Sequence, residues 1–326
     1  MLDGLTPVEE MFNSTVPAKR EPTSRRIFDL MSVELVGVGL AVFAAVALAV
    51  QSLTVRMSTK DQPVTGVITI MFVVNALVLV PVTLIRYYPD FGLTRVSIAA
   101  FAVAGVLGSF LARFALFVGI ARLGASRAEP LKSTFPLVAL VTAVLVLGEE
   151  LTVPILVGVV LLVGGAVAVS WDARASPATP TGRNLVVDIS FPLAAALLLG
   201  IDPVFVKQGL AEGTPALVGV TVRVLAAAAG FGLYLLWYRI RSGKHQLVRP
   251  TRWILLASVA NTIYLVAYLA ALARAPVSVI APILGASPLF VLLGSAVFIQ
   301  SEEKVTSRLV VSVLVLVAGV VLILSG

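Results

Sequence analysis

Long uninterrupted apolar runs constrain the fold of this chain more than any other feature. The segment "ITIMFVVNALVLVPVTLI" at 68–85, for example, contains no charged residue. Runs of about 18 or more apolar residues are long enough to cross the roughly 30 Å hydrocarbon core of a bilayer. Charged residues make up only 13% of the chain, about half of their share in a soluble domain. Backbone polar groups must pair internally in lipid, and the alternating segments of barrel strands are not visible. The sequence therefore predicts an all-α integral membrane protein.

Ten apolar runs predict ten transmembrane helices that are joined mostly by short loops. Residues 1–30 are polar and are expected to form a solvated N-terminal tail. The stretch 172–187, rich in Ala, Pro and Thr, is expected to link two five-helix halves, 31–171 and 188–326. The expected spans are roughly 32–54, 63–85, 96–121, 125–147, 152–171, 188–209, 214–238, 252–273, 276–299 and 305–325.

The two halves repeat one another. The segment "ARLGASRAEPLKSTFPL" at 121–137 returns at 273–289 as "ARAPVSVIAPILGASPL", with two prolines in the same register in each copy. Gln51 of the first half likewise matches Asp202 of the second. Because each half holds an odd number of spans, the second half must enter the membrane upside down relative to the first. Such inverted repeats are related by a pseudo-two-fold axis in the membrane plane and enclose a central cavity.

These features resemble the drug/metabolite transporter superfamily, and specifically its EamA-like ten-helix transporters. The resemblance covers 32–325 and rests on "YLAALARAPVSVIAPILGASPLFVLLGSAVF", on "TVRVLAAAAGF", and on a helix-end glutamate in each half, Glu149 or Glu303, followed by a downstream glycine. It identifies Arg223 with the arginine on the second helix of a family repeat, whereas the first half departs from the pattern with Met71. The resemblance implies a secondary transporter with a central cavity and cytoplasmic termini, often an exporter of amino acids or other small metabolites.

The composition excludes several classes of site. The chain has no cysteine and a single histidine, His245 in a basic loop, so disulfides and metal sites built on Cys or His are excluded, and no cofactor is expected. No GxxxxGK[ST] motif for ATP and no DxxxD cluster is present, and an enzyme is not expected. The net charge of +7 comes mostly from residues that border the spans. Topology and lipid headgroups explain that charge better than a nucleic-acid partner does.

Ionisable groups at membrane depth are costly and usually face a cavity or a partner. Six such groups stand out in the expected spans. Four of the six are cationic and two are anionic, which favours a substrate with an anionic group, zwitterions included. The alternative is that they form structural ion pairs, either Glu129 with Lys132 on one helix face, or Asp202 with Lys207 or Arg223. The six groups are Arg113, Glu129, Lys132, Asp202, Lys207 and Arg223.

Glu129 and Asp202 are the predicted proton-coupling residues, because no other carboxylate lies well inside an expected span. Each directly precedes a proline, Pro130 or Pro203. A proline removes one backbone hydrogen bond and can bend the helix beside the carboxylate, a geometry that transporter sites use.

The predicted substrate site adds polar residues to these charges. Gln51 is included because its repeat partner is Asp202, and Asn261, Tyr264 and Tyr268 because they share a helix face. An interhelical hydrogen bond is the commoner role of such groups in membranes. The complete predicted site is Gln51, Arg113, Glu129, Lys132, Asp202, Arg223, Asn261, Tyr264 and Tyr268.

The sequence thus predicts an alternating-access transporter of the plasma membrane. It would move a small polar metabolite, such as an amino acid or an organic anion, by proton exchange or down the substrate's own gradient, as a monomer or homodimer. An exporter of lipophilic cations, similar to the small multidrug resistance proteins, is the nearest alternative, ahead of an intramembrane enzyme and a passive facilitator. The positive-inside rule leaves the orientation open, because the tail and the loop after the seventh span are both basic and lie on opposite sides.

Overall fold

The computed structural model describes residues 23–123, 128, 131–148, 150–172, 185–242, 249–298 and 307–325. Throughout these ranges the regular structure is helical and contains no strand. Within the same ranges, six helices are long and apolar enough to cross a membrane: Glu34–Ser58, Val64–Tyr87, Arg95–Arg122, Val186–Ala211, Ala216–Arg241 and Arg252–Leu272. Large apolar side chains such as Leu77 and Ile85 point outward, with 70% and 87% of their surface exposed. Such a surface suits lipid rather than water, and the chain is a multi-pass membrane protein.

The first half begins with one long helix and contains one unusually wide helical segment. The predicted third span is a continuous helix made of α4 (Arg95–Ala104), the π-helical segment η1 (Gly105–Ala112) and α5 (Arg113–Leu123). Thr94 caps its start by accepting a hydrogen bond from the Ser97 backbone N–H. The other elements are α2 (Thr23–Ser58), α3 (Val64–Tyr87), α7 (Phe135–Thr142), the π-helical η2 (Ala143–Leu147) and α8 (Val153–Asp172).

The second half agrees with the predicted spans except in its fourth helix. Its elements are α9 (Leu185–Ala211), α10 (Ala216–Ser242), α11 (Arg252–Leu272), α12 (Val277–Gly285), α13 (Ser287–Phe298) and α14 (Ser307–Ser325).

The span predicted at 276–299 is divided at Ala286 into α12 and α13. Pro288 has no backbone N–H, so it cannot bond the carbonyl of Leu284, and a tighter bond from the Leu289 N–H to the Ala286 carbonyl (2.9 Å) replaces the regular pattern. The equivalent turn of the first half has the same bond, from the Leu137 N–H to the Thr134 carbonyl. The repeated prolines therefore break the helix in the same way in both halves.

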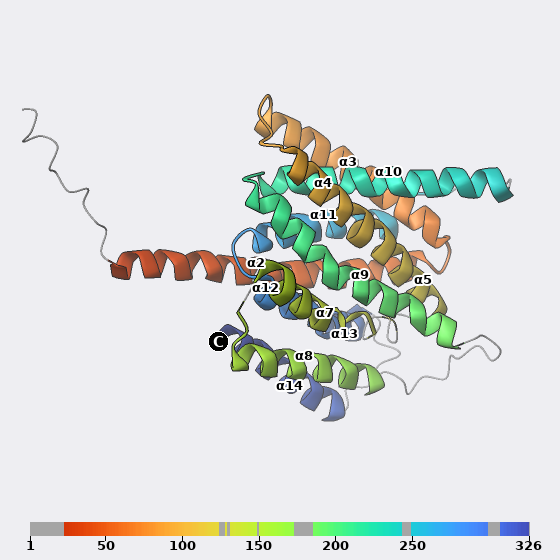
Figure 1. The fold of residues 1–326 in the computed structure, drawn as a ribbon. Helices are drawn as coiled ribbons and strands as arrows, with labels where there is room; N and C mark the ends of the chain where they lie inside the picture. Colours follow the sequence, from red (N-terminus) through yellow and green to blue (C-terminus); the bar gives the residue numbers. More distant parts are fainter. Residues whose placement is uncertain are drawn as a thin grey trace, which may run out of the picture.

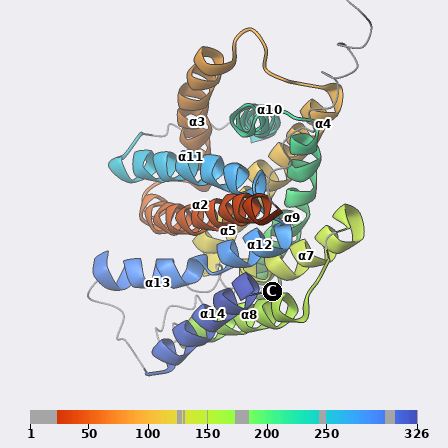
Figure 2. The same ribbon diagram turned by 90° about the vertical axis from the view of Figure 1, so that its left-hand side faces the viewer.

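Helices of the two halves pack on one another in matching pairs. The second, fourth and fifth helices of one half contact their counterparts in the other, as α3 with α10, α7 with α12, and α8 with α14. In the same way α2 packs on α11, and α9 packs on the α4–η1–α5 helix. Figures 1 and 2 show α8 and α14 side by side at one end of the bundle and α3 and α10 at the other. The contacts are thus symmetric under exchange of the two halves.

Two glycines bring α8 and α14 into backbone contact. A Cβ atom on Gly158 would lie 2.7 Å from the Gly319 carbonyl oxygen, and one on Gly319 would lie 2.8 Å from the Gly158 carbonyl. Small residues of this kind let membrane helices approach closely where no hydrophobic force between them is available.

Candidate functional site

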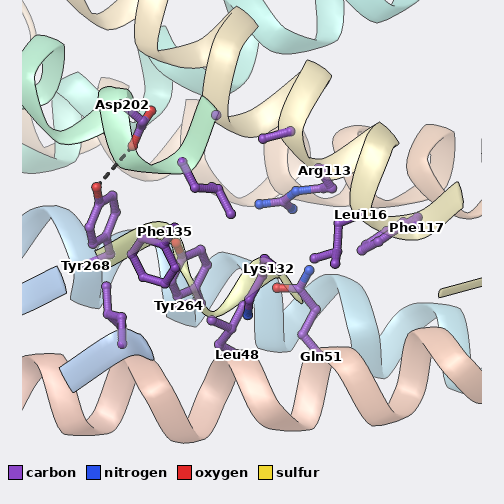
Figure 3. A pocket seen from close by; sticks show the side chains of 14 residues that line it. Leu48, Gln51, Arg113, Leu116, Phe117, Lys132, Phe135, Asp202, Tyr264 and Tyr268 are labelled. Atoms are coloured by element: carbon purple, nitrogen blue, oxygen red, sulfur yellow. Dashed lines mark hydrogen bonds between the residues drawn. The ribbon is translucent and has the colours of Figure 1, made fainter. Parts of the chain in front are cut away.

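A cavity of about 50 Å³ lies between the two halves. It has room for a few water molecules and is much smaller than the roughly 300–1,000 Å³ of typical ligand pockets. Figure 3 shows charged and aromatic side chains from several helices around it. Its lining residues are Leu48, Gln51, Gly108, Ala112, Arg113, Leu116, Phe117, Lys132, Phe135, Leu199, Asp202, Tyr264, Tyr268 and Leu284.

A buried ion pair between α9 and α10 forms one wall of the site. Arg223 Nη2 lies 3.0 Å from Asp202 Oδ1, and both side chains are only 1% exposed. Tyr268 donates its hydroxyl to Asp202 Oδ2 at 3.0 Å, a contact drawn in Figure 3. Arg223 Nε donates to Ser109 Oγ at 2.8 Å, and its guanidinium carbon lies 5.4 Å from the centre of the Tyr268 ring. Asp202 faces the cavity, whereas Arg223 lies behind it.

The π-helical segment η1 supports this ion pair with residues that have small side chains. A Cβ atom on Gly105 would collide with the backbone carbonyl of Arg223, and one on Gly108 would collide with the Asp202 carboxylate and lie 2.7 Å from Arg223 Nη2. Wide turns of this kind are frequent at functional sites. Here the widened turn brings a bare stretch of backbone against the two charged side chains.

Arg113 is held on the other side of the cavity by a network of amides and hydroxyls. It donates to the Asn261 side-chain oxygen, and the Asn261 amide in turn reaches Asn75. Asn75 also pairs with the Thr262 hydroxyl at 2.7 Å. Arg113, Asn75 and Asn261 are all buried, and a buried polar group is stable only when such partners are present.

Lys132 and Gln51 complete the polar lining. Lys132 is 1% exposed, and its Nζ lies 3.4 Å from the Ser287 hydroxyl. Gln51 is 3% exposed, and its side-chain oxygen has no hydrogen-bond partner among the described residues. An unpartnered amide beside a cavity has hydrogen-bonding capacity left for water or a ligand.

The aromatic residues of α11 form a second wall. The rings of Tyr264 and Tyr268 stack with centroids 5.7 Å apart and planes 13° apart. This α11 face opposes Asp202, so the carboxylate lies between a guanidinium and an aromatic surface.

Equivalent positions of the two repeats meet at the cavity. The register is that of the segments 121–137 and 273–289, in which Lys132 is equivalent to Leu284. Continued towards the N-terminus, the same register makes Ala112 equivalent to Tyr264 and Leu116 equivalent to Tyr268. Gln51 is equivalent to Asp202, and Leu48 to Leu199. All ten of these residues line the cavity. Matching positions of the two halves therefore meet here, but with different chemistry in each half.

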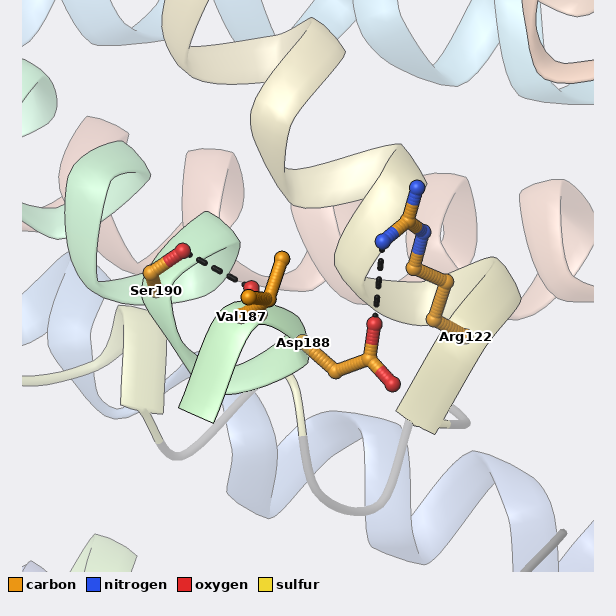
Figure 4. Close-up of polar contacts among 4 residues, drawn as sticks. All are labelled: Arg122, Val187, Asp188 and Ser190. Carbon is orange, nitrogen blue, oxygen red and sulfur yellow. Dashed lines mark hydrogen bonds and ion pairs between the residues drawn. The ribbon is translucent and has the colours of Figure 1, made fainter. Parts of the chain in front are cut away.

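A second buried carboxylate lies near the start of α9. Asp188 is 5% exposed and pairs with Arg122 at 3.0 Å, as Figure 4 shows. The Arg122 guanidinium also lies 4.7 Å from the centre of the Phe191 ring. The sequence analysis did not single out Asp188, because a residue at the edge of a predicted span cannot be told from an exposed one. It does not line the cavity.

Most of the predicted site residues converge on the cavity. Arg223 reaches the site through Asp202, and Asn261 reaches it through Arg113. Lys207 is not part of the site, since its Nζ donates to the Ala275 carbonyl at 2.7 Å. Glu129, together with Pro130, Glu149, His245 and Glu303, lies outside the described residues. The predicted residues that line the cavity are Gln51, Arg113, Lys132, Asp202, Tyr264 and Tyr268.

The structure adds lining residues that sequence patterns did not indicate. Leu48, Leu116, Phe117 and Phe135 resemble any other apolar residue of a span, and no sequence signal separates them from core or lipid-facing positions. Gly108 lies in "GVLGSFLA", a run of small and apolar residues of the kind that lets membrane helices pack closely. Its contact with Asp202 depends on the three-dimensional arrangement alone.

Comparisons with known proteins support the repeat and the fold. The model of the EamA-like transporter family matches residues 35–171 and again residues 188–325. A crystal structure of a protein with 19% sequence identity superposes with a TM-score of 0.68, over 90% of this chain and 96% of the other. That similarity concerns the fold alone. No curated protein matches the sequence significantly. Because the family model covers most of the chain in two copies, this protein belongs to the EamA-like transporter family, within the drug/metabolite transporter superfamily.

Proposed function

We propose that this membrane transporter is an alternating-access exporter of a small polar metabolite that carries an anionic group, such as an amino acid or an organic anion. The observation that carries the proposal is the cavity itself. Three buried cationic side chains, Arg113, Lys132 and Arg223, surround or adjoin it together with the carboxylate of Asp202. Charges buried in a membrane protein at this cost usually serve a substrate or ion pathway.

The proposed architecture is ten helices in two inverted repeats, divided at residues 172–187. The position of two equivalent loops supports the inversion. Asp61 lies in the loop just before the start of α3. Glu212 lies near the other end of α3, because it accepts a hydrogen bond (2.7 Å) from Thr94, in the loop after α3. Glu212 is equivalent to Asp61 in the repeat register, and α3 is about 36 Å long at 1.5 Å per residue. The two loops therefore lie at opposite ends of one transmembrane helix.

Transport would require the two halves to rock around the cavity. At about 50 Å³ the cavity is too small for an amino acid, so we infer that the structure corresponds to a closed conformation. In each half the first helix packs on the third helix of the other half, as α2 on α11 and α9 on the α4–η1–α5 helix. Opening to either side would widen the space between these two helix pairs.

Counterflow into proteoliposomes tests this function. Vesicles that contain the purified chain and an unlabelled metabolite should accumulate the labelled one, with saturable uptake. Arg223→Gln should reduce the initial rate at least tenfold, because it leaves the Asp202 carboxylate buried without its partner. Lys207→Gln serves as a control outside the cavity and should retain most of the rate. If Asp202→Asn left gradient-driven uptake intact, its proposed coupling role would be wrong.

The export of lipophilic cations is a second candidate, and the stacked Tyr264–Tyr268 wall next to Asp202 favours it. Aromatic rings and a carboxylate form a suitable site for an organic cation. In that case Arg223→Gln would leave transport of a dye such as ethidium unchanged, whereas Asp202→Asn would abolish it.

We further propose that the protein resides in the plasma membrane with both termini in the cytoplasm, as a monomer or homodimer. Family resemblance supports this orientation. The basic residues at the end of α10 and in the loop after it, including Arg239, Arg241 and Arg249, favour the opposite orientation under the positive-inside rule.

A further inference from the structure

We infer that the anion and a proton bind to this site together, with the proton on Asp202, so that a monoanionic substrate such as a monocarboxylate crosses as an electroneutral pair with H⁺. This inference rests on the proposed function and specifies its substrate class and the sign of its coupling. It distinguishes co-transport with a proton from exchange against one.

The Asp202 carboxylate has an ion-pair partner at one oxygen and a hydrogen-bond donor at the other, while Oδ1 has no hydrogen-bond partner among the described residues. Arg223 contacts Oδ1 and Tyr268 donates to Oδ2, and Gly108 packs against the same carboxylate. A substrate ammonium group would have to displace Arg223 from this position. The cavity therefore offers a poor site for a cationic group while Asp202 is ionised.

The groups that an anion would meet are different. Arg113 and Lys132 line the cavity directly. Arg223 lies behind Asp202, and its Nη1 has no hydrogen-bond partner among the described residues. An anionic group that enters the cavity therefore competes with Asp202 for nearby guanidinium groups.

No other carboxylate lines the cavity within the described part of the chain. Titratable groups face Asp202 from several of the elements packed on α9. Arg223 of α10, Tyr264 and Tyr268 of α11, and Arg113 at the start of α5 interact with Asp202 electrostatically, and Lys132 shares the cavity wall. The η1 segment contributes Gly108 and Ser109, which do not titrate.

Asp202 and a bound anion compete for the same cation. An anion that takes the place of Asp202 beside Arg223 lies next to the Asp202 carboxylate, in surroundings of low dielectric constant. The repulsion between the two carboxylates is only weakly screened there, which favours a proton on one of them. Since Asp202 loses its share of the guanidinium contacts when the anion binds, it is the group that takes up the proton.

The charges balance at each step. In the empty site Asp202⁻ is paired with Arg223⁺. When the cavity is open to one side, a proton from water forms an O–H bond on Asp202, and the substrate anion takes its place beside a guanidinium group. The total charge of the buried site is the same before and after. On the other side the anion and the proton leave together, and the ion pair forms again.

Ligand binding to the purified full-length chain tests the sign of this coupling. The thermal unfolding midpoint in detergent is titrated with sodium acetate, lactate and pyruvate at several pH values, with leucine as a zwitterion and tetraphenylphosphonium as a lipophilic cation. We expect the apparent affinity for a monocarboxylate to rise as the pH falls, by up to about tenfold per pH unit for one linked proton. Mixing protein and monocarboxylate in weakly buffered solution should remove protons from solution, as a pH-indicator dye reports.

Two asparagine variants locate the proton. Asp202→Asn mimics the protonated carboxyl and should bind the monocarboxylate tightly at every pH, without proton uptake. Asp188→Asn is the matched control, because Asp188 is another buried carboxylate of α9 and also pairs with an arginine, Arg122 of α5. It should keep the wild-type dependence on pH. If Asp202→Asn does not yield folded protein, the dye measurement on the wild type decides.

Several results would overturn the inference. A monocarboxylate affinity that does not depend on pH, or that falls in acid, contradicts the proton coupling but leaves anion transport in place. Undiminished proton uptake by Asp202→Asn has the same meaning. Tight binding of leucine with release of a proton would show that the substrate is a zwitterion whose ammonium group displaces the proton. The transporter would then exchange substrate against H⁺, which contradicts co-transport. Binding of tetraphenylphosphonium alone, or no binding by any monocarboxylate at any pH, contradicts both the inference and the proposed substrate class.

Discussion

At the scale of single residues, the site depends on an ion pair that is stable only in its surroundings. Asp202 and Arg223 are almost fully buried, and removal of one partner from such a pair typically costs about 3–5 kcal/mol because the other charge is left uncompensated. Tyr268 donates a hydrogen bond to Asp202, and Ser109 accepts one from Arg223. Gly108 leaves the space into which the Asp202 carboxylate fits.

Gly108→Ala should destabilise the protein by about 1–3 kcal/mol, because the added methyl group overlaps the Asp202 carboxylate. The thermal unfolding midpoint in detergent measures this cost. Much of it should disappear in an Asp202→Ala background, where the carboxylate is absent and Arg223 Nη2, 2.7 Å from the added Cβ, is no longer held there by its ion-pair partner. Gly232→Ala in α10, where nothing lies within 4 Å of the added Cβ, should be neutral or slightly stabilising. An equal cost for Gly108→Ala in both backgrounds would show that the carboxylate is not the group it meets.

Residue chemistry made part of this site predictable from sequence. Charged and polar residues inside apolar spans are conspicuous, and Asp202, Arg113 and Tyr268 were identified on that basis. Apolar lining residues such as Phe117 carry no such mark. The environment of Gly108 comes from Asp202 of α9 and Arg223 of α10, which lie far from it in the sequence, so periodicity within one helix cannot reveal it.

At the scale of elements, two departures from ideal helices shape the cavity. The η1 segment widens the third span where it meets Arg223, and the breaks before Pro136 and Pro288 divide the fourth helix of each half. The sequence located the helices well because apolar length and polar boundaries determine them, as for α3, predicted at 63–85. It did not predict η1, since a π-helical turn is selected by contacts with neighbouring helices.

The α8–α14 pair should be sensitive to the size of the residue at its crossing point. Gly158→Ala is expected to lower the thermal unfolding midpoint, because its Cβ would lie too close to the Gly319 carbonyl for the helices to keep their separation. Gly164→Ala on the same helix is the control, since nothing lies within 4 Å of its added Cβ. Equal midpoints for the two variants would mean that the two backbones are not in close contact.

At the scale of the whole molecule, the exchange-symmetric helix contacts and the ends of α3 support an inverted repeat. The absence of cysteine from the sequence makes the wild-type chain a ready background for labelling. Single cysteines at Asp61, Asp90 and Glu212 can be probed with a membrane-impermeant maleimide, and all three positions are exposed.

We expect Asp61→Cys to react in intact cells, and Asp90→Cys and Glu212→Cys to react only after permeabilisation. The equivalent loops of Asp61 and Glu212 would then lie on opposite sides of the membrane, with both termini in the cytoplasm. The reverse pattern would keep the inversion but place the termini outside. Labelling of Asp61→Cys and Glu212→Cys from the same side would rule out the inverted repeat.

The unequal lining of the cavity has a consequence for the history of the chain. A homodimer of two first halves would place two copies of Arg113 and Lys132 in one small space, without the Asp202 carboxylate that lines the observed cavity. A pairing of two second halves would bring two Asp202–Arg223 pairs and four tyrosines into the same volume. Neither assembly reproduces the observed chamber, so each duplicate has become dependent on the other, and a break in the chain at 172–187 would yield two fragments that function only when they recombine.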